Sequence, residues 1–214
     1  MPKQGAAMYR LYGKPFTMSM VPEGVMDELG IAHQSIMLPP GPTTDPAYLA
    51  LRPDGLVPTL TDGDLVIYEG SAIAMHLTEK HGALAPAIGT PERARWLQWM
   101  LYLGSMVHPA VALEFHPDWF TDDPAAIPAI QARARRSCDE LWRQIEGQLV
   151  EDAWLTGPEF TSADILFLVQ AMFHWDSPAM FARSPRVTAL VRRIHARPAM
   201  AALLARHDVP APAV

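Results

Sequence analysis

The chain has 214 residues, enough for one large domain or two small ones, and half of them are apolar. Charged residues make up 19%, too few for a disordered chain, so a buried core is expected. A net charge of −6 argues against nucleic acids and anionic membranes as partners. Cys138 is the only cysteine, which excludes an internal disulfide and a zinc site of two or four cysteines and indicates the reducing cytosol.

No stretch approaches the ~18 consecutive apolar residues of a membrane span, so no membrane partner is expected. Residues 1–7 are too polar and short for a signal peptide, which predicts no export and a cytoplasmic location. A P-loop, Gly-x-Gly-x-x-Gly, His-Glu-x-x-His and Gly-x-Ser-x-Gly are all missing from the sequence. The histidines show no ligand spacing on one helix, so we expect them to pack, cap or face solvent, with no metal bound. They include His76, His81, His108 and His174.

The first part of the chain switches between strand-like and helix-like patterns. Strand-like runs are found at 9–12, 35–38, 57–60 and 65–68. Helical patterns are found over 21–29, 45–51 and 71–80. A Gly-bearing turn joins the last two β-rich runs, which is typical of a hairpin. The predicted order β-α-β-α-β-β-α describes an α/β domain that ends in an antiparallel hairpin.

The second part of the chain is almost entirely helical by pattern. Glycines and prolines at 83–90 predict a linker, which divides the chain into an α/β domain at 8–82 and an all-α domain at 91–208. Thr161 and Asp164 form an Asp version of a capping box at the start of a helix that is apolar on all sides. We therefore expect this helix at the centre of the second core.

Val57 and Pro58 stand at the head of a predicted strand. Proline lacks an N–H and is excluded from central strands unless the local geometry is special. A cis proline at a strand start is one such case, and it leaves the backbone of Val57 available to pair with an extended ligand. An ordinary proline on an edge strand is the alternative.

Glu69, Gly70 and Ser71 stand at a predicted strand-to-helix junction. A helix N-terminus carries free N–H groups and the positive end of the helix dipole, so it attracts a carboxylate. Gly70 permits close backbone approach, Ser71 offers a hydroxyl, and Glu69 can pair with an ammonium group. The two sites together suit an α-amino acid, and a plain helix cap is the alternative.

Four motifs in the right order carry a resemblance to a known family. Residues 52–60, Arg-Pro-Asp-Gly-Leu-Val-Pro-Thr-Leu, match Asn-Pro-x-Gly-x-Val-Pro-x-Leu. Residues 69–73 match Glu-Ser-x-Ala-Ile, residues 160–165 match Phe-Ser-x-Ala-Asp-Ile, and residues 197–199 match a late Arg-Pro-Ala. From Tyr9 to His207 the chain resembles a bacterial-type cytosolic glutathione transferase, which has a thioredoxin-like N-terminal domain followed by an all-helical C-terminal domain.

The resemblance implies glutathione as co-substrate. Val57 would hold its cysteinyl part through the backbone, and Glu69 with residue 70 would hold the γ-glutamyl end. The family's serine falls on Gly70, so only the backbone N–H serves there unless Ser71 substitutes. Leu56 replaces a frequent Lys or Gln, which removes one polar contact. The expected glutathione-binding residues are Leu56, Val57, Pro58, Glu69, Gly70 and Ser71.

A transferase must favour the glutathione thiolate, so a donor has to lower a thiol pKa of ~8.5. The family places a Tyr, Ser or Cys between the first strand and the first helix. Here the common Ser or Cys position falls on Phe16, and the bacterial beta-class cysteine falls on Met18. Ser19, then Thr17, are the hydroxyls expected to reach the sulfur. The alternatives are a capping role alone for Ser19 and activation by backbone N–H groups.

The implied function is addition or exchange of the glutathione thiolate at a small apolar electrophile, held in a cleft against the second domain. A homodimer and a role in detoxification follow from the same resemblance, which also allows isomerase or peroxidase-type chemistry. A non-catalytic binding or assembly module on the same fold is the rival. The absent catalytic residue and Leu56 favour the rival, whereas Val57, Pro58 and Glu69 favour the enzyme.

Overall fold

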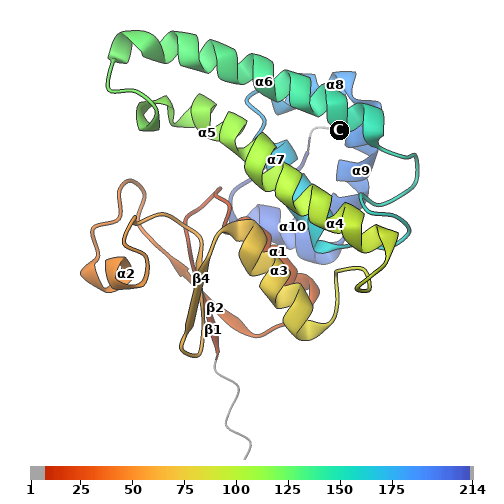
Figure 1. Cartoon of the computed structure of the whole chain (residues 1–214), viewed down its shortest axis with the longest axis horizontal. Coiled ribbons are helices and arrows are strands. Elements are labelled where there is room, and N and C mark those ends of the chain that lie inside the picture. The colour runs from red at the N-terminus through yellow and green to blue at the C-terminus, as the bar shows by residue number, and fades with distance from the viewer. Residues whose placement is uncertain (1–7, 213–214) are drawn as a thin grey trace, which may run out of the picture. The chain divides into compact units, whose positions relative to one another are not determined.

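The structure is a computed structural model that describes residues 8–212. Residues 1–7, on which the expectation of no export signal rests, lie outside the described part. The chain forms two compact units (Figure 1). The first runs to Ala85 and includes Pro198–Pro210, and the second consists of Pro86–Arg197 with residues 211–212. Within residues 8–212, no helix has the length and apolar character that spanning a bilayer requires.

A four-stranded mixed sheet forms the centre of the first unit. Its strand order is β2-β1-β3-β4, with β1 and β2 parallel and the other pairs antiparallel. The strands are β1 (Tyr9–Gly13), β2 (His33–Met37), β3 (Thr59–Asp62) and β4 (Leu65–Tyr68). The hairpin of β3 and β4 is the predicted one, and the order of elements confirms the thioredoxin-like prediction.

Helices cover the sheet because their apolar stripes match its alternating faces. The helices of this unit are α1 (Met20–Glu28), α2 (Pro46–Leu51), α3 (Gly70–His81) and α10 (Pro198–Arg206). Leu11 of β1 and Leu60 of β3 are buried, as are Val25 of α1 and Leu77 of α3. α1 packs against both α3 and α10. The core of this unit therefore includes the contacts of the sheet with α1 and α3, and α10 packs against α1.

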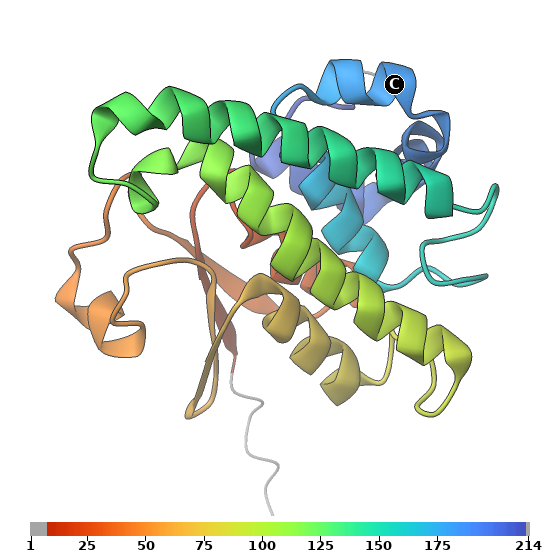
Figure 2. The same cartoon turned by 45° about the horizontal axis from the view of Figure 1, so that its top comes forward.

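The second unit is helical. Its described residues also include an isolated β-bridge between Trp154 and Gly157. Its helices are α4 (Pro91–Tyr102), the π-helical η1 (Leu103–Val107), α5 (His108–Phe115), α6 (Ile127–Gln148), α7 (Ser162–Met172), α8 (Ser177–Arg183) and α9 (Pro185–His195). Two short 3₁₀ turns are η2 (Pro117–Trp119) and η3 (Pro124–Ala126). α5 and α6 run side by side (Figure 2).

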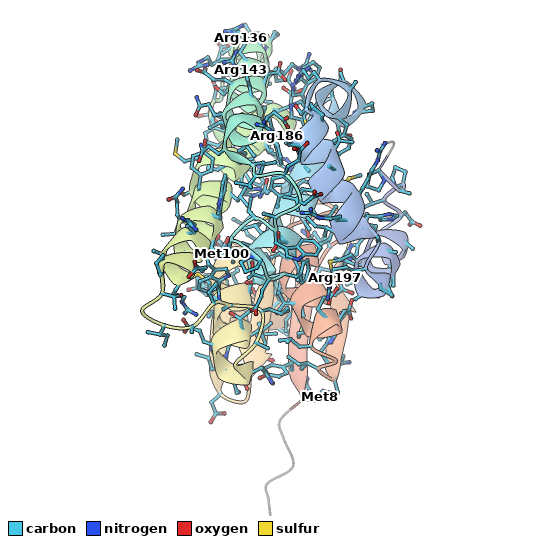
Figure 3. All side chains as sticks on the ribbon, turned by 90° about the vertical axis from the view of Figure 1, so that its right-hand side faces the viewer. Met8, Met100, Arg136, Arg143, Arg186 and Arg197 are labelled. Carbon is cyan, nitrogen blue, oxygen red and sulfur yellow. The ribbon has the colours of Figure 1, made fainter. Side chains whose placement is uncertain are left out.

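α7 is buried along its whole length, which confirms the predicted central helix. The capping box is present: Asp164 Oδ2 accepts from the Thr161 N–H at 2.8 Å, and the Thr161 side chain caps in return. Figure 3 shows Arg136 and Arg143 on the outer side of α6, whereas Met100 is fully buried. The division into apolar core and charged surface is the one that the helical periodicity predicts.

The domain limits 8–82 and 91–208 stay predictions, and the structure adds one observation about them. The break between the units falls between Ala85 and Pro86, inside the expected linker, but α10 packs against α1 in the first unit. An amphipathic stripe shows that a helix has a buried face and does not say which surface covers it. The return of the chain to the first unit was therefore not visible in the sequence.

Candidate functional site

Ser19 and Thr17 lie in the loop between β1 and α1, where their hydroxyls meet. Ser19 is fully buried, and its Oγ donates to the Lys14 carbonyl at 3.2 Å. Thr17 is half-buried, and its Oγ1 donates to the same carbonyl at 2.8 Å and lies 2.9 Å from Ser19 Oγ. Gly13 makes room for this pair, because a Cβ there would lie 2.4 Å from Ser19 Oγ.

The geometry bears on the alternatives for this loop. Ser19 occupies the N-cap position of α1, but its side chain makes no capping hydrogen bond. The first N–H groups of the helix are already used, since Met20 and Val21 donate to the carbonyls of Thr17 and Met18 at 3.0 and 3.2 Å. Each hydroxyl has one proton. Both protons are directed at the Lys14 carbonyl, so Thr17 can donate to a ligand only by giving up that bond and leaving the carbonyl to Ser19.

The segment Leu56–Pro58 precedes β3. Its Val57–Pro58 peptide bond is cis, which confirms the prediction. The main chain of Leu56 is engaged on both sides: its N–H donates to Asp54 Oδ1 at 2.9 Å, and its carbonyl accepts from the Tyr48 hydroxyl. Within residues 8–212 we find no hydrogen bond to the N–H or carbonyl of Val57. The half-buried Val57 therefore has both main-chain groups available to an extended ligand.

Glu69, Gly70 and Ser71 form the start of α3. Glu69 has a φ of 74°, in a region that residues with a side chain rarely adopt, and makes no side-chain cap to the helix. The first N–H groups of α3 have no acceptor within the helix, so they can bind a carboxylate. Gly70 is buried against the β1–α1 loop, and a Cβ at this position would lie 3.0 Å from the Met18 carbonyl oxygen.

Arg52 connects the two binding segments. Only 4% of its side chain is exposed, and its guanidinium donates to the Pro58 carbonyl at 2.9 Å. The same group pairs with Glu69 Oε1 at 3.2 Å and with Asp54 Oδ1 at 2.7 Å. The hydrogen bond from Arg52 lowers the pKa of the Asp54 carboxyl despite the opposing effect of burial. The sequence placed Arg52 in a motif where the family has Asn but did not indicate this bridging position.

The three predicted segments are therefore brought together at one end of the sheet. The β1–α1 loop follows the end of β1, and Leu56–Pro58 precedes β3, which is antiparallel to β1. Gly70 contacts Met18, and Arg52 bridges Pro58 and Glu69. Every residue predicted for glutathione or for its sulfur belongs to this cluster or adjoins it in sequence.

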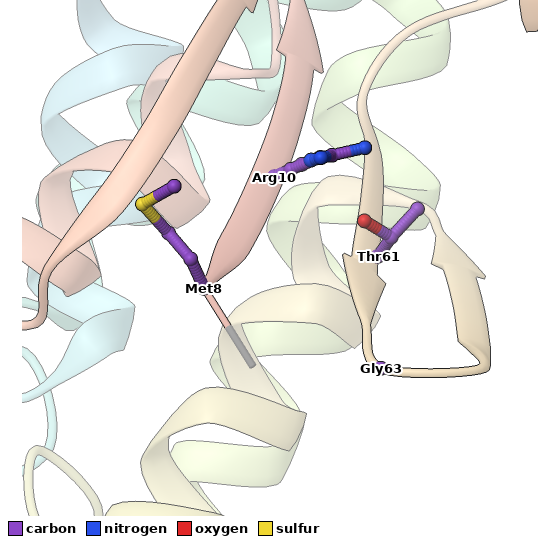
Figure 4. Close-up of a pocket in the computed structure, with 4 residues that line it drawn as sticks. All are labelled: Met8, Arg10, Thr61 and Gly63. Carbon is purple, nitrogen blue, oxygen red and sulfur yellow. The ribbon is translucent and has the colours of Figure 1, made fainter. Parts of the chain in front are cut away.

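A separate cavity of about 240 Å³ opens at the other end of the sheet. Figure 4 shows its lining residues, Met8, Arg10, Thr61 and Gly63, around the start of β1 and the β3–β4 turn. The candidate histidines pack elsewhere: His76 Nε2 lies 3.0 Å from Asp62, and His81 Nε2 lies 3.0 Å from the Tyr9 hydroxyl. No three potential metal ligands gather anywhere in the described part of the chain.

Comparisons with known proteins agree with this arrangement. Residues 11–87 match the family model described as glutathione S-transferase, N-terminal domain. Glutathione S-transferase 3 of Zea mays is 28% identical over 221 residues, covering 96% of this chain and 97% of its own. A glutathione S-transferase structure from Xylella fastidiosa has a TM-score of 0.82 at 25% identity, covering 94% of this chain and all of the other.

A sphingomonad glutathione S-transferase, solved with glutathione, has a TM-score of 0.79 at 26% identity, and the match covers 94% of this chain and all of the other. The N-terminal family model, the curated relatives and the solved structures together support a bacterial-type member of the glutathione transferase superfamily, which confirms the resemblance in the sequence. The thioredoxin-like sheet followed by helices is the architecture of those structures.

Proposed function

We propose that this chain is a glutathione transferase that adds the thiolate of glutathione to a small apolar electrophile. The observation that carries the proposal is the convergence in the first unit of an unengaged Val57 backbone, an uncapped α3 N-terminus and the Glu69 carboxylate. An extended peptide with an α-amino acid end matches these groups in shape and charge.

In this proposal the γ-glutamyl carboxylate binds the N–H groups of Gly70 and Ser71 at the start of α3. The ammonium group pairs with Glu69, whose carboxylate is 73% exposed on its side chain. The cysteinyl part pairs with the main chain of Val57, beside Pro58. Leu56, which is 41% exposed, contributes an apolar contact only. Arg52 fixes Pro58 and Glu69 relative to each other, which supports preorganised binding.

The sulfur then lies near the β1–α1 loop. We propose that the half-buried Thr17 donates to the thiolate and that Ser19 acts through Thr17, because the Ser19 hydroxyl is fully buried against Gly13. A hydrogen bond to the charged sulfur favours the thiolate over the thiol and so lowers the thiol pKa. The thiolate attacks the electrophilic atom, and the electron pair passes to the leaving group or to the adjoining π-system.

The proposal includes a homodimer in the cytoplasm and a role in detoxification. Exposed apolar side chains support an interface on the second unit: Leu97, Leu101 and Met106 are 37%, 59% and 53% exposed. Cys138, the single cysteine, is buried, and burial raises the pKa of its thiol to about 12, so the thiol is unreactive. A free thiol of this kind is compatible with a reducing compartment.

Calorimetric titration with glutathione tests the proposal. We expect saturable binding by the wild type and at least about tenfold weaker binding by Glu69→Gln, since a charged hydrogen bond is worth about 1.5–3 kcal/mol. Glu79→Gln, near the other end of α3, is the matched control and should bind as the wild type does. Absence of binding to the wild type overturns the proposal.

The rival, a non-catalytic binding module, is favoured by one observation: Phe16 occupies the position of the usual catalytic residue and Ser19 is buried. Both functions are compatible with glutathione binding, so the discriminating measurement is the ultraviolet absorbance of the bound thiolate across pH. A bound thiol whose pKa equals that of free glutathione, together with no turnover of a panel of aryl halides and epoxides, favours the rival.

A further inference from the structure

The C-terminal end of the first unit forms a buried polar network with α1. Glu23 of α1 and His207, the residue after α10, are each only 3% exposed. His207 Nε2 lies 2.8 Å from Glu23 Oε2, and Arg206 Nε donates to Glu23 Oε1 at 3.1 Å. Arg206 also pairs with Asp27. Burial by itself raises the pKa of the Glu23 carboxyl, but the interactions with His207 and Arg206 outweigh it and lower that pKa. Glu23 is therefore a carboxylate.

The second nitrogen of the same ring reaches the β1–α1 loop. The backbone N–H of Phe16 donates to His207 Nδ1 at 3.3 Å. A ring nitrogen that accepts a hydrogen bond carries no proton, so the proton of His207 lies on Nε2, where it is donated to Glu23. Glu23 thus selects the tautomer in which Nδ1 is an acceptor.

The residue held in this way has an unusual backbone conformation. Phe16 has a φ of 52°, in the left-handed region that residues with a side chain rarely adopt. It directly precedes Thr17, so the orientation of the main chain at Phe16 determines where the Thr17 hydroxyl points. A hydrogen bond to the Phe16 amide therefore acts on that hydroxyl without touching it.

We propose that His207 is a positioning residue for the glutathione sulfur site, with Glu23 setting its tautomer. Through the Phe16 amide it holds the loop in the shape that presents the Thr17 hydroxyl to the sulfur. The proposal rests on the proposed function, because the loop is the sulfur site only if glutathione binds there. It assigns a role to a C-terminal residue that none of the four family motifs includes.

Two substitutions separate positioning from simple packing, because amide side chains can replace one ring nitrogen at a time. The carbonyl of His207→Asn can take the place of Nδ1 and accept from Phe16, but it cannot reach Glu23. The amide NH₂ of His207→Gln can take the place of Nε2 and donate to Glu23, but it offers Phe16 no acceptor at the Nδ1 position.

The test measures hydrogen exchange at the Phe16 amide in ¹⁵N-labelled protein, together with the pKa of the bound glutathione thiol. In His207→Gln we expect exchange at Phe16 to rise at least about tenfold, the bound thiol pKa to rise, and kcat to fall about tenfold with KM for glutathione nearly unchanged. In His207→Asn we expect Phe16 to stay protected and the thiol pKa to stay low, while the melting temperature falls. His33→Asn is the control, because the ring of His33 forms its hydrogen bond with the carbonyl of Ile31, two residues earlier in the chain.

The exchange measurement keeps failure of this proposal distinct from failure of the proposed function. Equal protection of Phe16 in the wild type and in His207→Gln overturns the positioning role, whatever the activity. If the wild type does not bind glutathione while the two variants still differ at Phe16, the proposed function has failed and His207 positions a loop that is not a sulfur site. The ¹⁵N shifts of the His207 ring in the wild type need no variant: protonation on Nδ1 contradicts the proposal.

Discussion

Replacing Asp164 by alanine removes the acceptor of three hydrogen bonds inside the second unit. The carboxylate is fully buried and accepts from the Leu155 N–H at 2.8 Å, the Thr161 N–H at 2.8 Å and the Thr161 hydroxyl at 3.1 Å. Two buried N–H groups without an acceptor cost about 4 kcal/mol together. Part of this cost is offset, because burial raises the pKa of Asp164 to about 6 and so penalises the charged form.

The sign of the pH dependence follows from that raised pKa. The folded state binds the proton of Asp164 more tightly than the unfolded state, so the stability that this residue contributes decreases as the pH rises from about 4 through 6. With an unfolded pKa of ~3.9, the offset is about 1.5 kcal/mol at pH 5 and nearly 3 kcal/mol at pH 7. We therefore expect Asp164→Ala to lose about 2–3 kcal/mol at pH 5 and about 1 kcal/mol at pH 7.

Urea unfolding of the wild type and the variant, followed by tryptophan fluorescence, measures this difference at each pH. Trp96 is a suitable probe because its Nε1 donates to Ser162 Oγ at 3.0 Å at the start of the same helix. Other titrating groups cancel between the two proteins. A loss that grows between pH 5 and pH 7 refutes the reasoning. Glutathione affinity per folded molecule should not change, since Asp164 belongs to the second core.

Four further substitutions probe the sulfur and glutathione sites. Thr17→Val should slow turnover about 10- to 100-fold, because this factor corresponds to the free energy of a hydrogen bond from a hydroxyl to a charged sulfur. Steady-state kinetics should show a smaller effect for Ser19→Ala. Arg52→Lys keeps the charge but cannot bond Pro58, Asp54 and Glu69 together, so calorimetry should show about tenfold weaker glutathione binding. Gly70→Ala brings a Cβ to 3.0 Å from the Met18 carbonyl and should cost about 1–2 kcal/mol in urea unfolding. Unchanged values in any of these experiments contradict the corresponding contact.

The fold could be predicted because its signals are local. The stripe in α1, the Gly-bearing turn between β3 and β4 and the capping box at Thr161 each depend on residues a few positions apart, and all three are present. The placement of α10 could not be predicted, since the surface that covers a helix is decided by tertiary packing. Its amphipathic pattern shows a buried face that includes Met200, Leu203 and Leu204 but does not say which unit covers that face.

The candidate site could be predicted only where a motif marks it. Proline and junction patterns indicate Val57 and Glu69, whereas Arg52 appears only as the first residue of the matched run 52–60, with no role of its own. The bond between Phe16 and His207 joins residues 191 positions apart, and no spacing rule covers such a distance. The sequence also could not show that Ser19 is buried, because a serine at a helix start has the same pattern whether its hydroxyl faces inward or outward.

Two departures from the family pattern are connected by a single contact. The family's serine is replaced by Gly70, and the bacterial beta-class cysteine position is occupied by Met18. In the structure these two residues touch: the Met18 carbonyl would lie 3.0 Å, and its terminal methyl 3.3 Å, from a Cβ at position 70. A serine at position 70 would therefore require the loop at Met18 to shift by a few tenths of an ångström. Without a serine at position 70, the proposed site has the N–H groups of α3 for the carboxylate. Without a cysteine at position 18, it has the hydroxyls of Thr17 and Ser19 as side-chain donors. In the proposed site, backbone donors and a hydroxyl pair therefore do the binding, and the contacts of Phe16 with His207 and of Arg52 with Pro58 hold their segments in place.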